Sequence, residues 1–428
     1  MLYFKRVAMV LLFVLMLPAF AWTTTLQLPL KGAVVQDFIP SGWHLLDSVS
    51  FDFNHDGLED IAAVTEAAVP QTYDDLTDNE EPWNPRILFV LQNTGDGYVL
   101  SLEDENAIRT RDEGGIWGDP WEPLSAEGDA FTVNAYGGSN WRWAEHFTYK
   151  YRNDQWVLTQ SGVSSYFMGE TRSEYLYDYE NGRGSRMEAN DCGKTVTYEV
   201  RLDPPPAIKN YDFNSVRLRP PPLPPFTVKD YRAAPGINIK GIQIPPPSTD
   251  ESAGGHILHT QDYVGYRFFT NTKEYFAVYH LKSQTVYVVA ELDKTAQGFM
   301  KAAFNNAWFY NGRIYLNPAY SRDLGRLKET DVDTTKLYTT ELIAMQPDGA
   351  APQTLFTHQF ETRADYVYLT LLCEFGGGEV VINVYGPDPQ LFYRVDINNG
   401  KPELLGELGN CTTEEMEAYM ETRYDEDN

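Results

Sequence analysis

A short acidic stretch near the N-terminus, residues 51–64, carries side chains that could bind a hard cation. Ca²⁺ takes about six to eight oxygen ligands, and a loop supplies them most simply from alternate residues. Starting at Asp52, the stretch reads D-x-N-x-D-G-x-x-D. The predicted ligands are the side chains of Asp52, Asn54, Asp56 and Asp60 and the backbone carbonyl of Leu58.

The residues on both sides of this loop are strand-like, which separates it from an EF-hand. An EF-hand would place a bidentate Glu at the twelfth position, where this chain has Ala63. The loop instead resembles the FG-GAP and VCBS-type motif, in which the ligands lie in a turn between two antiparallel strands. This resemblance implies that the same five positions hold the ion.

A tight turn without an ion is the alternative interpretation. Asp56-Gly57 is a favourable hairpin turn, and Asp and Asn side chains stabilise turns through local backbone hydrogen bonds. However, three carboxylates within nine residues repel one another unless a cation or solvent separates them. The sequence therefore favours a structural calcium site.

Other residue groups give weaker predictions. His256 and His259 have an HxxH spacing without an intervening Glu, and on a strand they would not share a face, so zinc is disfavoured. Five tryptophans could form a sugar-stacking platform, but alternation assigns most of them to the core. They are Trp117, Trp121, Trp141, Trp143 and Trp156. A polar strand face with Arg142 and Lys150 is the better place for an anionic ligand, although it could equally be a solvated face.

No sequence motif for catalysis is present. The chain has no nucleophile elbow, phosphate-binding loop or dinucleotide fingerprint. It has 61 Asp and Glu residues, so a carboxylate pair for glycoside hydrolysis stays open, but nothing singles out one pair. A noncatalytic protein is favoured, and a secreted polysaccharide hydrolase is the alternative.

The N-terminal residues predict export. Lys5 and Arg6 precede an apolar run, and Ala19-Phe20-Ala21 offers a small-residue cleavage site, so residues 1–21 are predicted as a signal peptide. We expect a secreted protein, extracellular or in the cell envelope, with no membrane insertion after cleavage. The formal net charge of −27 disfavours nucleic acid as a partner and attracts divalent cations.

The fold is predicted as mostly β, because aromatic and β-branched residues are frequent and helical periodicity is scarce. Residues 26–202 are expected to form an antiparallel β domain that contains the calcium loop. Residues 203–254 hold three proline runs and are predicted as a linker or strap. Residues 255–410 are predicted as a second antiparallel domain, and 411–428 as an acidic helix or tail that begins with a capping box.

Three Tyr-rich units after residue 255 repeat short strands around Asn-Gly, Asp-Gly or Gly-Gly turns, as propeller blades do. The stretches "YNGRIYL" and "AMQPDGAAPQTLF" resemble blades of TolB-like bacterial propellers, which implies a propeller-like domain, complete or incomplete. The N-terminal half contains the stretches "SGWHLLDSVSFDFNHDGLEDIAAVTE", "PRILFVL", "GGIWGDPWEPL", "YGGSNWRWAEHFTYKYRNDQWVL" and "SSYF". With these stretches, residues 30–200 resemble a recurrent domain of secreted Firmicutes-type proteins. That resemblance implies export and a β fold, and it implies no activity.

The chain has only three cysteines, so at least one thiol is unpaired. We expect Cys373 to pair with Cys411, since both lie in the C-terminal half, and Cys192 to be free. Taken together, the sequence predicts an exported, noncatalytic, calcium-braced β protein that binds a glycan or protein at or outside the cell envelope.

Overall fold

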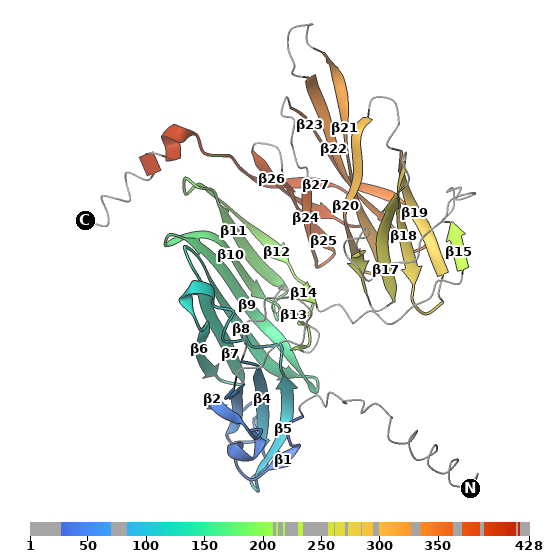
Figure 1. The fold of residues 1–428 in the computed structure, drawn as a ribbon. Coiled ribbons are helices and arrows are strands. Elements are labelled where there is room, and N and C mark those ends of the chain that lie inside the picture. Colours follow the sequence, from blue (N-terminus) through green and yellow to red (C-terminus); the bar gives the residue numbers. More distant parts are fainter. Residues whose placement is uncertain are drawn as a thin grey trace, which may run out of the picture.

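The computed structural model describes residues 27–69, 84–208, 211–212, 217–218, 230–233, 256–260, 262–269, 273–283, 285–293, 299–326, 334–362, 370–385, 389–416 and 418–419. Regular structure in these ranges is almost entirely antiparallel β strand, which confirms the mostly β prediction (Figure 1). Two short 3-10 helices are η1 (Val35–Phe38) and η2 (Gly115–Trp117). The predicted signal peptide lies outside the described residues. Among the helices of the described part, none is long and apolar enough to cross a membrane.

The first sheet has five strands in the order β1-β5-β4-β3-β2, all paired antiparallel. They are β1 (Lys31–Gly32), β2 (Trp43–Phe51), β3 (Asp60–Ala67), β4 (Arg86–Asn93) and β5 (Tyr98–Asp104). A hairpin joins β4 and β5, and its turn closes with the Thr94 N–H donating to the Gly97 carbonyl at 2.9 Å. The loop between β2 and β3 is the predicted calcium loop.

The second sheet has seven strands, and neighbours in the chain are neighbours in the sheet. They are β6 (Trp121–Glu127), β7 (Ala130–Gly138), β8 (Trp141–Arg152), β9 (Gln155–Phe167), β10 (Glu170–Asp178), β11 (Arg183–Ala189) and β12 (Thr195–Arg201). Its hairpins are tight: Met168 and Gly169 between β9 and β10 have φ values of 50° and 89°. Two successive positive φ values suit the right-handed twist of the flanking strands.

The inner face of this seven-stranded sheet is covered twice. Phe131, Phe147 and Tyr149 pack against the first sheet, in one core with Val64 and Val90. Further along, the inner-face side chains of β10–β12 pack against the last sheet of the chain. This second cluster includes Tyr177, Val196, Tyr198, Val200, Val381, Phe392 and Leu408. We call the opposite face, which carries His146, the outer face.

The C-terminal half contains three consecutive antiparallel meanders, as the three Tyr-rich units predict. Their strands are β16 (His256–His259), β17 (Tyr263–Phe269), β18 (Lys273–His280) and β19 (Thr285–Asp293); β20 (Phe299–Tyr310), β21 (Arg313–Arg326), β22 (Thr334–Met345) and β23 (Gln353–Thr362); and β24 (Thr370–Gly376), β25 (Glu379–Tyr385), β26 (Gln390–Asp396) and β27 (Pro402–Leu408). Three four-stranded meanders in succession make this half propeller-like.

These meanders pack face to face in chain order. Phe276 and Val278 of the first meander share a core with Ile314 and Leu316 of the second. The opposite face of the second meander packs on the third through a separate core, which contains Tyr315, Tyr338, Leu342, Val380, Ile382 and Val395. Because the third meander also covers the seven-stranded sheet, the two halves of the chain are continuous through packed apolar side chains.

Three short strands lie among the described residues of the predicted proline segment. They are β13 (Tyr211–Asp212), β14 (Arg217–Leu218) and β15 (Asp230–Ala233). β15 pairs parallel with β19 at the edge of a sheet. At the start of the segment, the Pro206 carbonyl accepts a hydrogen bond from the Leu158 N–H at 2.9 Å.

The disulfide prediction was wrong. Cys192 pairs with Cys411, and Cys373 is free. Cys192 lies in the turn between β11 and β12, and packing of β12 against β27 brings the chain after β27 to that turn. Cys373 lies within β24, where burial raises the pKa of its thiol well above the usual range.

Residues around the bridge hold the C-terminal segment to the seven-stranded sheet. The Asn190 amide donates to the Gly409 carbonyl at 2.6 Å, and Lys194 lies 2.7 Å from Glu415. The predicted capping box is present, because the Glu415 N–H donates to the Thr412 hydroxyl at 3.1 Å and Glu415 accepts from the Thr412 N–H at 3.0 Å.

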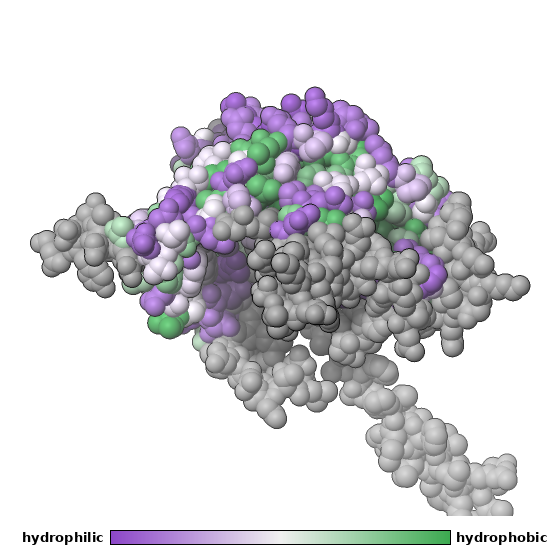
Figure 2. All heavy atoms as spheres, turned by 90° about the horizontal axis from the view of Figure 1, so that it is seen from above, coloured by the Kyte–Doolittle hydropathy of each residue, from purple (hydrophilic) through white to green (hydrophobic). Residues whose placement is uncertain are grey.

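Figure 2, from above, shows hydrophilic residues over much of the described surface with smaller hydrophobic groups between them.

Candidate functional site

The predicted calcium loop is the connection between β2 and β3, as its strand-like flanks indicate. The Asp52 carboxylate accepts from the N–H groups of Asp56 and Gly57 at 3.2 and 3.0 Å. Asn54 Oδ1 accepts from the Asp56 N–H at 3.0 Å. The Asp56 carboxylate accepts from the Leu58 N–H at 2.8 Å and from the Asn54 amide at 2.9 Å. The loop is therefore closed by hydrogen bonds from its own side chains.

Asp60 differs from the other acids of the loop because its side chain is fully buried. Its carboxylate accepts from the backbone N–H groups of Phe53 and Asn93, at 3.1 and 2.8 Å. Burial raises the pKa of Asp60, the hydrogen bonds from Asn93 and Phe53 oppose this shift, and the charges of Asp56 and Asp52 add to it. The three acids therefore lie close enough to affect one another.

Whether these residues hold a cation is a separate matter from their proximity. Carboxylate, amide and carbonyl oxygens are the donor types that Ca²⁺ prefers, and a bound cation would stabilise the buried Asp60 anion. In the described part of the chain, however, no three His, Cys, Asp or Glu side chains are placed as a ready metal site. The calcium site stays a prediction.

The HxxH pair lies on a strand. His256 and His259 are the first and last residues of β16, whose pairing with β17 is irregular between His256 and Leu258. His256 pairs with Tyr266 and His259 with Val264, so one extra residue on β16 interrupts strict alternation between the two histidines. The strand therefore does not by itself place them on opposite faces, and the zinc prediction is not tested.

The five tryptophans do not form one platform. Trp156 is a core residue with 3% of its surface exposed. The rings of Trp121 and Trp143 lie against the guanidinium groups of Arg86 and Arg109, with their centroids 5.7 and 5.1 Å from Cζ. The two that remain are half exposed, Trp117 at 51% and Trp141 at 54%.

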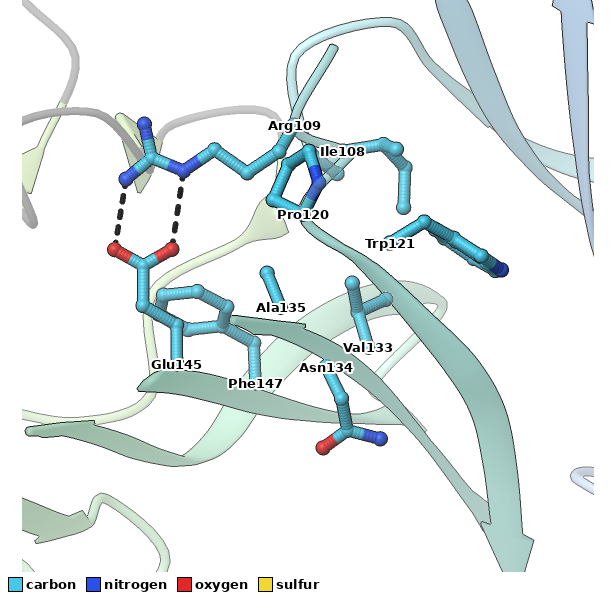
Figure 3. Close-up of a pocket in the computed structure, with 10 residues that line it drawn as sticks. Ile108, Arg109, Pro120, Trp121, Val133, Asn134, Ala135, Glu145 and Phe147 are labelled. Carbon is cyan, nitrogen blue, oxygen red and sulfur yellow. Dashed lines mark hydrogen bonds and ion pairs between the residues drawn. The ribbon is translucent and has the colours of Figure 1, made fainter. Parts of the chain in front are cut away.

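The arginines under these rings make structural ion pairs. Arg109 binds Glu145 through two bonds, Nε to Oε2 at 3.1 Å and Nη2 to Oε1 at 2.7 Å (Figure 3). The cavity beside this pair, lined also by Trp121 and Phe147, has a volume of about 10 Å³. That volume suffices for about one water molecule, so this pocket is part of the core and not a ligand site.

The outer face of the seven-stranded sheet has larger recesses. Three of them, with volumes of about 450, 560 and 350 Å³, lie next to one another. The first and second share His146 and Leu176, and the second and third share Tyr136 and Tyr166. They form a continuous hollow, which we call the outer groove. It crosses from β12 to β7, a distance of roughly 24 Å at ~4.8 Å per strand.

His146 lies in the middle of the outer groove. It is paired across the sheet with Gly162, and a Cβ at position 162 would come within 1.9 Å of the imidazole Cε1. Gly162 therefore leaves the space that the imidazole occupies. Desolvation of the ring lowers the pKa of His146, and the nearby Glu174 opposes this shift. In its neutral form an imidazole can both donate and accept a hydrogen bond.

Of the two cations predicted for this face, the structure leaves one available. Lys150 lies 2.9 Å from Glu180 and 3.8 Å from Asp129, so its charge is compensated. Arg142 is exposed and lines the third recess. Within the described residues it pairs with no carboxylate.

Sequence reasoning missed the residues that surround Arg142. Trp117 reaches the outer face because the η2 segment packs on the β7–β8 hairpin, where the Gly138 N–H donates to the Gly114 carbonyl at 2.9 Å. The Gly-Gly pairs at 114–115 and 137–138 were the available signal, since glycines permit two backbones to approach closely. Tyr166 comes from β9 by pairing with Arg142, which is a long-range contact.

Comparisons with known proteins add little beyond the fold class. No family model matches the sequence, and no curated protein matches it significantly. Among solved structures, the Nup133 β-propeller domain of Vanderwaltozyma polyspora aligns over 85% of this chain and 91% of that chain, with 8% identity and a TM-score of 0.21. The mannose phosphorylase MPT-4 of Leishmania mexicana aligns over 87% and 90%, with 10% identity and a TM-score of 0.18. TM-scores this low carry no argument about function.

Proposed function

We propose that this protein is an exported, noncatalytic β protein that binds a glycan or a protein through the outer groove, with a glycan as the favoured ligand. The observation that carries this proposal is the continuous groove on the outer face of the seven-stranded sheet. The inner face of the same sheet is occupied by two packed sheets, so within the described part of the chain the outer face is the one open to a partner.

The shape and lining of the groove fit an extended, hydroxyl-rich ligand. A hollow of roughly 24 Å is longer than a small metabolite needs, and it is open along its length. The imidazole of His146 and the side-chain amides of Asn134 and Gln160 provide groups that can donate and accept hydrogen bonds. Tyr136 and Tyr166 add ring surface, which suits the apolar faces of sugars.

Calcium has a bracing role in this proposal. Asp52, Asn54, Asp56 and Asp60, with the Leu58 carbonyl, would hold the ion in the β2–β3 loop. The bound ion supplies positive charge beside the buried Asp60 carboxylate. The loop belongs to the first sheet, which packs on the inner face beneath part of the groove, so bracing it supports the sheet that presents the groove. The FG-GAP-like spacing supports this role.

Export rests on the N-terminal residues and on the likeness to secreted Firmicutes-type domains. With a signal peptide at 1–21, the mature protein would act in the extracellular space or the cell envelope. Millimolar calcium outside cells suits even a weak loop site, with Kd on the order of 10⁻⁴–10⁻³ M.

A glycan array, with product release measured on every bound glycan, tests the function. The matched variants are Ala144→Gln, which puts a longer side chain into the middle recess, and Thr197→Gln, which adds the same side chain at an exposed position of β12 outside the groove. We expect binding by the wild type and Thr197→Gln, and loss of binding by Ala144→Gln. No release of shortened products is expected.

Two results would contradict the proposal. If Ala144→Gln binds as well as Thr197→Gln, the ligand does not occupy the groove. If bound glycans are cleaved, the protein is a hydrolase and the noncatalytic assignment is wrong.

A further inference from the structure

Arg142 is held in a fixed position at one end of the outer groove. Its guanidinium lies over the Trp117 ring, with Cζ 4.6 Å from the ring centroid. Nη1 donates to the Tyr136 hydroxyl at 3.1 Å, and Nε donates to the Ser139 carbonyl at 3.2 Å. Trp117 and Tyr136 themselves meet edge to face, with centroids 5.1 Å apart and an interplanar angle of 87°. The aromatic pair and the two hydrogen bonds therefore fix the direction of the guanidinium.

The charge of Arg142 is not compensated within the described residues. A guanidinium has five N–H donors, and the two hydrogen bonds above leave three of them without a partner there. Two other arginines contrast with it: Arg152 of the same strand lies 2.8 Å from Asp129, and Arg109, in the loop after β5, binds Glu145. In a chain with a formal net charge of −27, an exposed cation held without a carboxylate is open to an anion from outside.

The recess beside Arg142 has the size and walls of a subsite for one sugar unit. Its volume is about 350 Å³, and its lining includes Tyr136, Tyr166, Asn140 and Ser139. The two hairpin turns at its rim are joined, since the Met168 N–H donates to the Asn140 carbonyl at 3.0 Å. A preformed recess of this kind loses little conformational entropy when it binds a ligand.

We propose that this recess binds the carboxylate-bearing sugar of an acidic glycan, such as a uronic acid residue, with the free edge of Arg142 on the carboxylate. The proposal rests on the proposed glycan-binding function and adds the chemistry of one subsite. Planar guanidinium and carboxylate groups match in a two-bond geometry, and Tyr136 and Tyr166 offer ring surface for the sugar itself.

The rest of the groove limits how much charge the ligand carries. Glu122 and Glu174 line the middle recess, so a second carboxylate on the next sugar would meet two acids. A ligand with one acidic unit at the Arg142 end and neutral units beyond it fits this distribution best. A glycan with a carboxylate on every sugar should therefore gain less binding free energy per sugar in this groove.

Isothermal titration calorimetry with short saccharides tests the subsite. The probes are galacturonic acid linked to a neutral galactobiose, the fully neutral galactotriose, and triglutamate as an acidic peptide. The variants are Arg142→Ala and its control Arg111→Ala, which removes an exposed guanidinium that lines none of the three recesses. Tyr136→Phe keeps the ring and removes the hydroxyl that holds Nη1.

The wild type and Arg111→Ala are expected to bind the acidic saccharide at least tenfold more tightly than galactotriose. Arg142→Ala should lose this preference while it still binds galactotriose like the wild type. Tyr136→Phe should lose part of the preference. These results together support the subsite, since a general charge effect would change Arg111→Ala as much as Arg142→Ala.

Three outcomes would overturn the inference. In the first outcome, the wild type binds the acidic and the neutral saccharide equally, and Ala144→Gln still fails to bind neutral glycans. The carboxylate subsite is then wrong, and the glycan-binding function remains. Tighter binding of triglutamate than of either saccharide makes an acidic protein segment the ligand. No binding of any glycan removes both the subsite and the proposed function.

Discussion

Removal of the Cys192–Cys411 bridge should weaken the whole C-terminal half of the protein. The bridge closes a loop of 219 residues, which contains all three C-terminal meanders, and ties its end to the β11–β12 turn. Without it, the unfolded chain is free to separate these two points, while the native chain keeps them together through the β12–β27 contact and the Asn190–Gly409 hydrogen bond.

The size of the effect follows from loop closure. In the chain-entropy model, a cross-link over a loop of this length lowers the free energy of the native state relative to the unfolded state by about 5 kcal/mol. For a unit of about 200 residues, each kcal/mol changes the melting temperature by roughly 2–4 °C. We therefore expect Cys192→Ser or Cys411→Ser to lower the melting temperature by roughly 10–20 °C.

Thermal melting with and without a thiol reductant measures this change, and Cys373→Ala is the control. Cys373 is free, so its replacement should cost only about 1 kcal/mol and should leave sensitivity to reductant intact. The reasoning is refuted if reductant leaves the wild-type melting temperature unchanged. It is also refuted if Cys373→Ala abolishes the effect of reductant, because Cys373 would then be part of the bridge.

Excess Ca²⁺ should raise the melting temperature of the wild type by a few degrees over a sample with EDTA, since Ca²⁺ at ten times Kd stabilises the native state by about 1.4 kcal/mol. Asp56→Ala should show no such shift. Equal melting temperatures of both proteins with Ca²⁺ and with EDTA would argue against the site. Arg86→Leu should lower the free energy of unfolding, measured by urea titration, by about 3–5 kcal/mol, because the buried Glu66 carboxylate loses the guanidinium 2.6 Å away. A decrease below about 1 kcal/mol would show that this ion pair does not stabilise the fold. Burial lowers the pKa of His358, so the unfolded chain binds more protons than the native chain between that pKa and about 6.5. The free energy of unfolding should therefore fall as the pH drops through this window, and His358→Gln should show a smaller fall. Identical dependence of the melting temperature on pH in the wild type and His358→Gln would contradict this prediction.

The local pattern of the sequence determined the strands and hairpins. In β8, alternation correctly separates Phe147 and Tyr149, which are buried, from His146 and Arg142, which are exposed. The three Tyr-rich units correctly predict three antiparallel meanders. Alternation and turn chemistry act between residues close in the chain, so a single sequence contains this information.

The position of the candidate calcium loop could be predicted for the same reason. All its candidate ligands lie between Asp52 and Asp60, and the structure places them in the expected turn between two strands. The burial of Asp60 was not visible, because it depends on Asn93, a residue from β4 that donates to the carboxylate.

Only the tertiary structure decided which residues meet across the chain. The cysteine pairing depends on β27 packing against β12, which no local pattern encodes. Likewise, Arg142 and Lys150 are equivalent by alternation, yet Lys150 meets Glu180 from the β10–β11 turn while Arg142 meets Trp117 and Tyr136. The outer groove exists because two separate sheets occupy the inner face of one long sheet and leave its outer face to solvent in the described part of the chain. Such contacts join residues far apart in sequence, so their outcome is set by how whole sheets pack and not by the order of neighbouring residues.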